Sequence, residues 1–383
     1  PALERLGVPP LVGYFLLGFA LRLADARWTV LGEAGHQIFE FLAYVGVVVL
    51  LFHVGLESDL PSLIQRLPSA SIIWVGNVSV SGGLAYWAAT QGLGWDMLPS
   101  LFVAVALTAT SVSIPVALWE EAALLNTDDG ELMLDVAELD DLSGVVLMGV
   151  LFTLAPALHQ NPEASILPLA AETLGWFAVK FAAFGVGCVL FSRYMEASIT
   201  GFFEQIQNWP GTIMVVLGIG MIVAAIAGLL GFSLAIGAFF AGLIFSRDPK
   251  AVKMDTSFGA IYPLFAAFFF IGIGLRVAPT ALGDAWGPAL VLLAVAVAGK
   301  MLGTLLPALA FTSGTGALLL GLSLVPRAEI MLIIMQRGLD LGAWAVPSAL
   351  FANTVLVSAA TTLLVPPLVR PLLQQRRTAV GPT

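Results

Sequence analysis

The sequence predicts an all-α polytopic membrane protein with twelve visible transmembrane helices, arranged as two inverted repeats that each contain one broken crossing helix. Three observations lead to this fold. Hydrophobic residues make up 59% of the 383 positions and charged residues only 11%, whereas an ordinary globular domain has roughly a quarter charged residues. Apolar runs of membrane-spanning length follow one another along the chain. Two of these runs contain a proline near the middle, where a helix is expected to be interrupted.

Hydropathy places the helices in order along the chain, at about the length that a hydrocarbon core of roughly 30 Å requires. The predicted spans are 9–24, 36–56, 69–91, 98–121, 129–156, 166–192, 211–229, 232–247, 256–277, 286–311, 314–338 and 343–373. The segments between them are short, so we expect no soluble domain. The net charge of −9 therefore belongs to loops, and it argues against a nucleic-acid partner.

The basic loop residues predict the orientation, because positively charged loops stay in the cytoplasm. Loops on the side of the N-terminus contain Arg5, Arg66, Arg193, Arg247, Lys250, Lys253, Arg370, Arg376 and Arg377. Loops on the other side contain only Arg22, Arg27, Arg276 and Arg337. We therefore expect both visible termini, including the C-terminus, to be cytoplasmic.

Matches between distant spans predict the two repeats. At one constant offset, Gly7, Gly13, Phe15 and Gly18 fall on Gly231, Gly237, Phe239 and Gly242. At slightly smaller offsets, Gly55 falls on Gly274 and Pro115 falls on Pro326. Small residues at helix contacts would explain any one glycine pair alone. The prediction of a duplication therefore depends on the common order of the matches.

The spans with Pro115 and Pro326 are expected to be the broken helices. In hydrocarbon, unwound backbone is tolerated only inside protein or along a cavity, where it offers carbonyl groups and half-helix ends to ions. Hydroxyl side chains gather beside the first break, namely those of Thr108, Thr110, Ser111 and Ser113. The simpler alternative is a proline kink with hydroxyls bonded back to the helix. Two breaks at corresponding positions favour an ion site.

Asp140, Asp141 and Lys300 fall near the centre of their spans. An unpaired charge at this depth costs about 2.5–3.5 kcal/mol, so each group should be paired, protonated or in contact with water. Adjacent helical residues point about 100° apart, which lets one aspartate neutralise Lys300 while the other faces a cavity. A hard cation and a proton compete for the same carboxylate oxygens. The pattern indicates proton-coupled cation exchange; a structural ion-pair network is the alternative.

These residues resemble the cation:proton antiporter superfamily, in the branch of Nap-type sodium/proton antiporters and Kef-type potassium efflux proteins. The resemblance covers nearly the whole chain, through GVPPLVGYFLLG, AYVGVVVLLFHVGLE, LTATSVSIP, ELDDLSG, GFSLAIGAFFAGLIFS, AGK and VPRAE. It implies an electrogenic, elevator-type exchange of Na⁺ for protons by a homodimer in a bacterial inner membrane, without a cofactor and without enzyme activity.

The resemblance also assigns residues. Asp141 is the expected ion-binding acid, and Asp140, which pairs with Lys300, is expected to hold Na⁺ together with it. Thr110 is a ligand near the crossing, with Thr108 and Ser111 beside it. The dimerisation domain is expected from 1–68 and 211–285, the core domain from 69–156 and 286–383, and a linker helix from 157–210. A further helix ahead of the first span would make thirteen and place the N-terminus outside.

Glu138, Arg327 and Glu329 are expected to modulate the site. Glu138 lies on nearly the same helix face as Asp141, at positions i and i+3. We expect Glu138 to pair with Arg327 of the other broken helix, with Glu329 in the same network; a third titrating acid is the alternative.

Other functions fit less well. The double aspartate favours sodium over a Kef-like K⁺/H⁺ antiporter, where Gln-Asp is usual, and a sodium-coupled organic-solute symporter would need a larger polar cavity. An intramembrane aspartyl protease needs its two acids on different helices. A channel has no evident use for a buried lysine at a deep anionic site.

Overall fold

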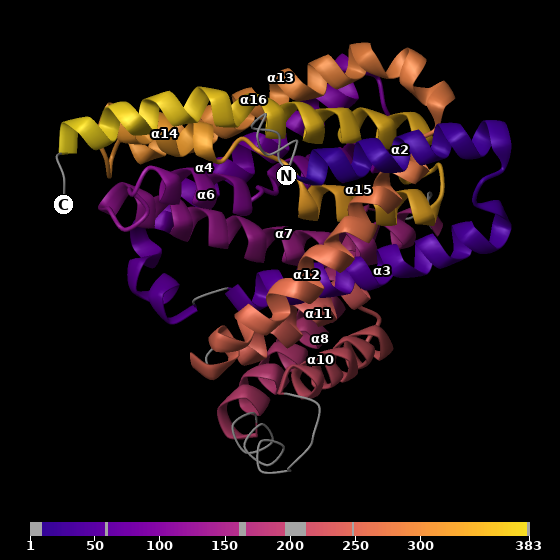
Figure 1. Ribbon diagram of the computed structural model, residues 1–383, viewed down its shortest axis with the longest axis horizontal. Helices are drawn as coiled ribbons and strands as arrows, with labels where there is room; N and C mark the ends of the chain where they lie inside the picture. Colours follow the sequence, from indigo (N-terminus) through magenta and orange to yellow (C-terminus); the bar gives the residue numbers. More distant parts are fainter. Residues whose placement is uncertain (1–9, 58–59, 161–165, 196–211, 247–248, 381–383) are drawn as a thin grey trace. The chain divides into compact units, whose positions relative to one another are not determined.

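The computed structural model describes residues 10–57, 60–160, 166–195, 212–246 and 249–380 (Figure 1). All regular structure in these ranges is helical, which confirms the predicted fold class. The unbroken helices are α2 (Pro10–Trp28), α3 (Gly32–Glu57), α4 (Leu60–Trp87), α7 (Asp128–Gln160), α8 (Ile166–Tyr194), α10 (Thr212–Leu229), α11 (Leu234–Phe245), α12 (Pro249–Arg276), α13 (Leu282–Ala308) and α16 (Ser348–Val380). Short π- and 3₁₀-helical turns, η1 (Ala88–Gly92) and η2 (Pro279–Ala281), follow α4 and precede α13.

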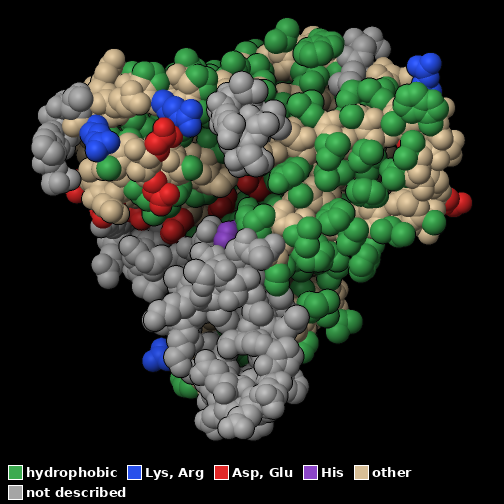
Figure 2. All heavy atoms as spheres, in the orientation of Figure 1, with side chains coloured by type: hydrophobic (Ala, Val, Ile, Leu, Met, Phe, Trp, Pro, Cys, Tyr) green, Lys and Arg blue, Asp and Glu red, His purple; other side chains and the backbone are tan. Residues whose placement is uncertain are grey.

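The surface is that of a membrane protein. Six of the described helices or helix pairs are long and apolar enough to cross a bilayer. Hydrophobic side chains cover much of the described surface in Figure 2. On α8, for example, Trp176, Val179 and Val186 are 63%, 62% and 58% exposed. Side chains of this kind are stable on a surface only where lipid or another protein covers them.

The two remaining predicted spans are each split into half-helices, α5 (Met97–Thr108) with α6 (Ser113–Glu121) and α14 (Gly314–Ser323) with α15 (Glu329–Leu341). Ala109 ends the first half-helix by turning to an extended conformation, with ψ of 150°. The backbone N–H of Ser111 donates to the carbonyl of Pro326 at 2.9 Å, so the two breaks touch each other. The predicted interruptions are confirmed.

The prolines relate to the two breaks in different ways. Pro326 lies within the second break, as predicted. Pro115 lies instead in the first turn of α6, after the first break. A helix tolerates proline in its first turn, because the N–H groups there have no partner within the helix. Pro115 therefore begins the second half-helix rather than forming the break.

The chain divides into two compact units. Unit 1 comprises Pro1–Trp28, Pro61–Leu147 and Ile273–Thr383, and unit 2 comprises Thr29–Leu60 and Met148–Gly272. In unit 1, α16 (yellow in Figure 1) packs against α13 and α14, and α15 packs against α5. Trp119 of α6, buried to 1% exposure, anchors this packing by donating from its indole N–H to the hydroxyl of Ser323 at 2.9 Å.

Two helix crossings support the predicted inverted repeat. In unit 2, a Cβ at Gly55 of α3 would collide with the carbonyl oxygen of Phe239 in α11. In unit 1, a Cβ at Gly274 of α12 would collide in the same way with the carbonyl oxygen of Phe15 in α2. The sequence matches relate Phe15 to Phe239 and Gly55 to Gly274. The two crossings therefore use corresponding residues with the halves exchanged, as a pseudo-two-fold axis requires.

Candidate functional site

Asp140 of α7 is the centre of a buried hydrogen-bond network in unit 1. Its side chain is fully buried, and its carboxylate Oδ2 lies 2.7 Å from the Nζ of Lys300, which is also fully buried. Thr110 donates from its hydroxyl to the same oxygen at 2.6 Å. Asn77 of α4 donates from Nδ2 to Oδ1 at 2.8 Å and to Oδ2 at 2.6 Å. The predicted pairing of Asp140 with Lys300 is confirmed.

Lys300 also binds the broken helix directly. Its Nζ donates to the carbonyl oxygen of Thr108 at 2.7 Å, at the C-terminal end of α5. The last carbonyl groups of a helix lack partners within the helix and have a partial negative charge, so they favour a cation. The interruption of α5 thus provides the second acceptor that a buried ammonium group needs.

The carboxylate of Asp141, the next residue, differs from that of Asp140 in its hydrogen-bond partners. Its side chain is only 8% exposed, and no hydrogen bond or ion pair joins its carboxylate to another residue in the described part of the chain. The negative charges of Glu329, Asp140 and Glu138 act on it, and Lys300 is the opposing positive charge. A buried carboxylate with no partner is costly unless it binds a proton or a cation.

The hydroxyl groups of the first break do not all face the carboxylates. Thr110 binds Asp140, as described above. The hydroxyl of Thr108 donates back to the carbonyl of Val105 at 2.7 Å, so Thr108 contributes its own carbonyl oxygen rather than its side chain. The hydroxyls of Ser111 and Ser113 lie 3.3 Å apart. Ser113 also donates to Oε1 of Glu329, at the N-terminus of α15, at 3.3 Å.

Arg327 does not form the predicted pair with Glu138, and that prediction is wrong. Arg327 is fully buried, and its Nη1 donates to the carbonyl oxygens of Ala109 at 2.7 Å and Leu324 at 3.3 Å, while Nη2 lies 3.5 Å from that of Ala296. Ala109 and Leu324 are the residues that follow α5 and α14. The carbonyl groups at these two half-helix ends neutralise the guanidinium in place of a carboxylate.

Glu329 and Glu138 approach Asp141 from two sides. Ile330, the residue after Glu329, packs near Gly144 of α7, one turn beyond Asp141. Glu138 lies one turn before Asp141 on the same helix face. No group of three His, Cys, Asp or Glu side chains within the described ranges is close enough to hold a metal ion jointly. The acids therefore do not form a closed metal-binding cage.

Nearly the whole chain matches one family of membrane transporters. Residues 1–375 match the family described as "Sodium/hydrogen exchanger, transmembrane". The chain belongs to the sodium/hydrogen exchanger family. The predicted membership among cation:proton antiporters is confirmed, and with it the expectation of a transporter rather than an enzyme, since the relatives below are antiporters by name.

Several relatives of this exchanger-family chain match over most of both lengths. The high-affinity Na⁺/H⁺ antiporter NhaS3 of Synechocystis sp. is 25% identical, over 97% of this chain and 79% of that protein. The Na⁺/H⁺ antiporter of Enterococcus hirae is 29% identical, over 88% of this chain and 84% of that protein. The Na⁺/H⁺-K⁺ antiporter GerN of Bacillus cereus is 27% identical, over 96% and 90%.

A solved structure supports the fold. The sodium proton antiporter MjNhaP1 of Methanocaldococcus jannaschii at pH 8 superimposes with a TM-score of 0.76, over 98% of this chain and 94% of that one, at 14% sequence identity. At this identity the likeness establishes the common fold alone.

Sequence reasoning missed one residue in this exchanger-family site, Asn77. A signal existed, because Asn77 is an amide within the apolar span 69–91 and a buried amide needs partners. Its partners could not be read from the sequence, because Asp140 and Lys300 lie on helices far along the chain. The structure brings them together where α4 crosses α13.

Proposed function

We propose that this chain exchanges a monovalent cation, with Na⁺ as the preferred ion, for protons across a membrane. Membership of the sodium/hydrogen exchanger family supports this proposal, as do the names of the relatives. The observation that favours it most is the contrast between adjacent acids. Asp140 is saturated by donors, whereas Asp141 is more than nine-tenths buried and has no partner in the described part of the chain.

Competition at Asp141 gives the exchange its coupling. In a site shielded from water, the carboxylate of Asp141 binds either a cation or a proton, and each displaces the other. Backbone carbonyls and hydroxyls at the two breaks supply further oxygen ligands of the kind that a hard cation prefers. Asp140 accepts hydrogen bonds from Lys300, Asn77 and Thr110, so it orients the charged groups next to Asp141.

The movement that exposes the site to each side is proposed to be of the elevator type, in a homodimer with a cytoplasmic C-terminus. The core domain would comprise 69–156 and 286–383, and the dimerisation domain 1–68 and 211–285, with 157–210 as the linker. Most of the proposed core, namely α4 to α6, most of α7 and α13 to α16, lies in one compact unit. That unit also contains α2, which the proposal assigns to the dimerisation domain. Exchange is proposed to be electrogenic, because Lys300 offers a second proton carrier beside Asp141.

Potassium is a second candidate for the transported ion. The relative GerN is named as a Na⁺/H⁺-K⁺ antiporter, and the potassium-efflux protein KefC of Shigella flexneri is 26% identical over 72% of this chain. An unpartnered carboxylate with carbonyl and hydroxyl neighbours does not by itself separate Na⁺ from K⁺. The experiment below therefore compares the ions directly.

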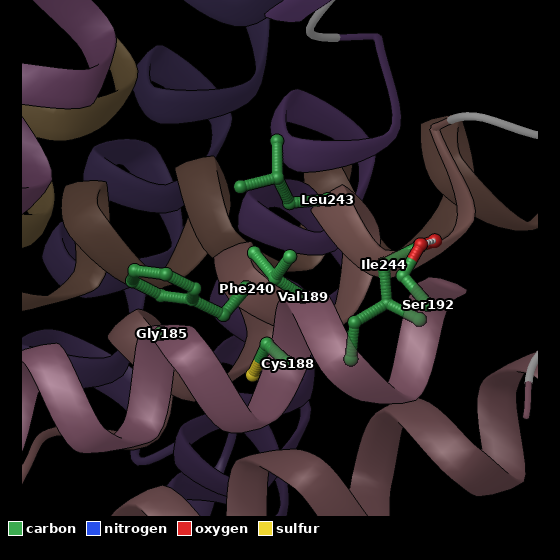
Figure 3. A pocket seen from close by; sticks show the side chains of 7 residues that line it. All are labelled: Gly185, Cys188, Val189, Ser192, Phe240, Leu243 and Ile244. Carbon is green, nitrogen blue, oxygen red and sulfur yellow. Dashed lines mark hydrogen bonds between the residues drawn. The ribbon is translucent and has the colours of Figure 1, made fainter. Parts of the chain in front are cut away.

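The pocket drawn in Figure 3 does not favour an organic solute. The pocket in Figure 3 lies in unit 2, between α8 and α11, and is lined by Gly185, Cys188, Val189, Ser192, Phe240, Leu243 and Ile244. Its one hydroxyl, that of Ser192, donates to the backbone carbonyl of Ile244 at 2.6 Å. The lining thus has no charged group that could bind an amino or carboxylate group of a solute.

The test is cation-dependent dequenching of a pH dye in proteoliposomes, with Na⁺, Li⁺ and K⁺ added separately. The wild-type protein is expected to respond to Na⁺, and Asp141→Asn is expected to abolish the response while the purified protein keeps its elution profile. Asp128→Asn is the matched control, because it makes the same change in the exposed first turn of α7. Normal exchange by a folded Asp141→Asn protein would refute the assignment of the site.

A further inference from the structure

Asn77 occupies an unusual position in the site, because one amide nitrogen reaches both oxygens of the Asp140 carboxylate. The distances are 2.8 Å to Oδ1 and 2.6 Å to Oδ2, and Asn77 is fully buried. Oδ2 has two other donors, Thr110 and Lys300. Within the described residues, Oδ1 has Asn77 alone. The oxygen of Asp140 that faces away from Lys300 and Thr110 therefore depends on a single neutral donor.

Close packing of α4 against α13 places Asn77 next to Asp140 and Lys300. A Cβ at Gly303 of α13 would lie 2.8 Å from the Cα of Asn77, and one at Gly76 would lie 2.8 Å from the carbonyl oxygen of Gly303. The two helices therefore cross at backbone distance, as small residues allow in membranes. Lys300 lies one turn before Gly303, so the crossing brings Asn77 and Lys300 to the same carboxylate. On the other side, the hydroxyl of Ser81 lies 3.5 Å from Oδ1 of Asn77, at the limit of a hydrogen bond.

We propose that Asn77 is a positioning residue that keeps Asp140 from coordinating the transported cation, and that it thereby sets the affinity of the site. This inference rests on the proposed function, since it assumes that Asp141 binds the cation. Asn77 itself touches neither the cation nor Asp141; it acts through Asp140.

The affinity of the site depends on the number of carboxylate oxygens that the cation can reach. With Asn77 present, the donors to Asp140 fix both oxygens, and the cation meets the carboxylate of Asp141 only. Without the amide, Oδ1 of Asp140 becomes an anionic acceptor with no donor, in a buried site where such a group is costly. A cation bound to the adjacent Asp141 is the nearest group that can satisfy it. Binding becomes tighter and release becomes slower.

The experiment measures the Na⁺ dependence of exchange in proteoliposomes for Asn77→Leu, which is close to asparagine in size but has no donor. Both the apparent KM for Na⁺ and the maximal rate are expected to fall, the KM by about tenfold, because a hydrogen bond to a charged group is worth about that factor. A purely structural role for Asn77 would lower the rate through loss of active protein and leave KM unchanged. Na⁺-dependent thermal stabilisation of the purified variant gives the affinity independently of transport.

Three further variants complete the test. Asn77→Gln keeps the amide and is expected to return KM towards the wild-type value. Ser81→Ala is the matched control, since Ser81 touches Asn77 but not Asp140, and its KM should equal that of the wild type. Asn77→Ala removes the donor without added bulk. If Asn77→Leu does not fold, the KM of Asn77→Ala for Na⁺ tests the proposal instead.

The outcomes separate the two proposals. An unchanged or raised KM in folded Asn77→Leu or Asn77→Ala overturns the role of Asn77 while leaving cation exchange intact. Absence of cation-dependent exchange in the wild-type protein refutes the proposed function instead. If Asn77→Leu binds Na⁺ more tightly in the thermal assay and exchanges it more slowly, the positioning role is supported.

Discussion

Replacement of Arg327 by methionine tests how the two broken helices are held together. Arg327 is fully buried, and its guanidinium donates to the carbonyl oxygens of Ala109 and Leu324, at the ends of α5 and α14. Methionine has a similar length and fills the space, but it has no donor. Both half-helix ends would then lose a cation, and their carbonyl groups would stay buried with fewer partners.

The expected loss of stability depends on the number and geometry of the hydrogen bonds that Arg327 donates. The contacts at 2.7 and 3.3 Å are hydrogen bonds to a charged donor, each worth about 1.5–3 kcal/mol. The contact with Ala296 at 3.5 Å is at the limit and adds little. Burial of the methionine side chain in place of a charge recovers part of the loss. We therefore expect a decrease of about 3–5 kcal/mol in the free energy of unfolding.

Thermal unfolding of the purified protein in detergent measures the effect, and the expected shift in Tm is on the order of 5–10 °C. Arg370→Met is the matched control, because Arg370 pairs with Glu121 at 3.2 Å on the surface, where the two side chains are 43% and 56% exposed. Pairs of this kind contribute from nothing to about 1 kcal/mol, so the control should melt close to the wild type. Equal melting temperatures for Arg327→Met and the control would refute the view that the guanidinium holds the half-helix ends.

Two further predictions concern helix α13. In Lys300→Gln, exchange is expected to continue with less charge moved per turnover, which an imposed membrane potential across proteoliposomes would reveal; unchanged voltage dependence in an active variant would make Lys300 a structural counter-ion. Gly303→Ala should destabilise the protein, since the new Cβ would lie 2.8 Å from the backbone of α4, whereas Gly287→Ala on the same helix meets nothing within 4 Å and should be neutral or slightly stabilising in the same melting assay.

The pairing of Asp140 with Lys300 could be predicted because ionised groups near the centre of apolar spans are few. Each needs a partner of opposite charge, so the number of possible pairs is small. The breaks were predictable for a related reason, since proline removes a backbone donor and lies at corresponding points of two apolar spans. Proline alone does not decide the matter, because Pro68, Pro156 and Pro263 lie inside continuous helices. In both cases the constraint comes from the membrane environment and not from the details of packing.

The partner of Arg327 could not be predicted, because it is backbone. Side chains alone suggest acidic partners such as Glu138, but an interrupted helix also exposes carbonyl groups that can bind a cation. Pro115 was misplaced by a few residues for a similar reason, since the same residue can end one helix or begin the next. Asn77 was missed because a neutral amide in a helix gives no sign of which partner it has.

The charges around the crossing support the proposed role of Asp141. Lys300 and Arg327 are both fully buried, and Asp140 neutralises one of them. The C-terminal ends of α5 and α14, which accept from these two cations, together contribute about one negative charge and neutralise the other. The N-terminal ends of α6 and α15 contribute about one positive charge, and Glu329 lies at the second of them. Glu138 is less deeply buried than Asp140 and Asp141. Among the described residues, the carboxylate of Asp141 is then the buried acid that has no hydrogen-bond or ion-pair partner of its own.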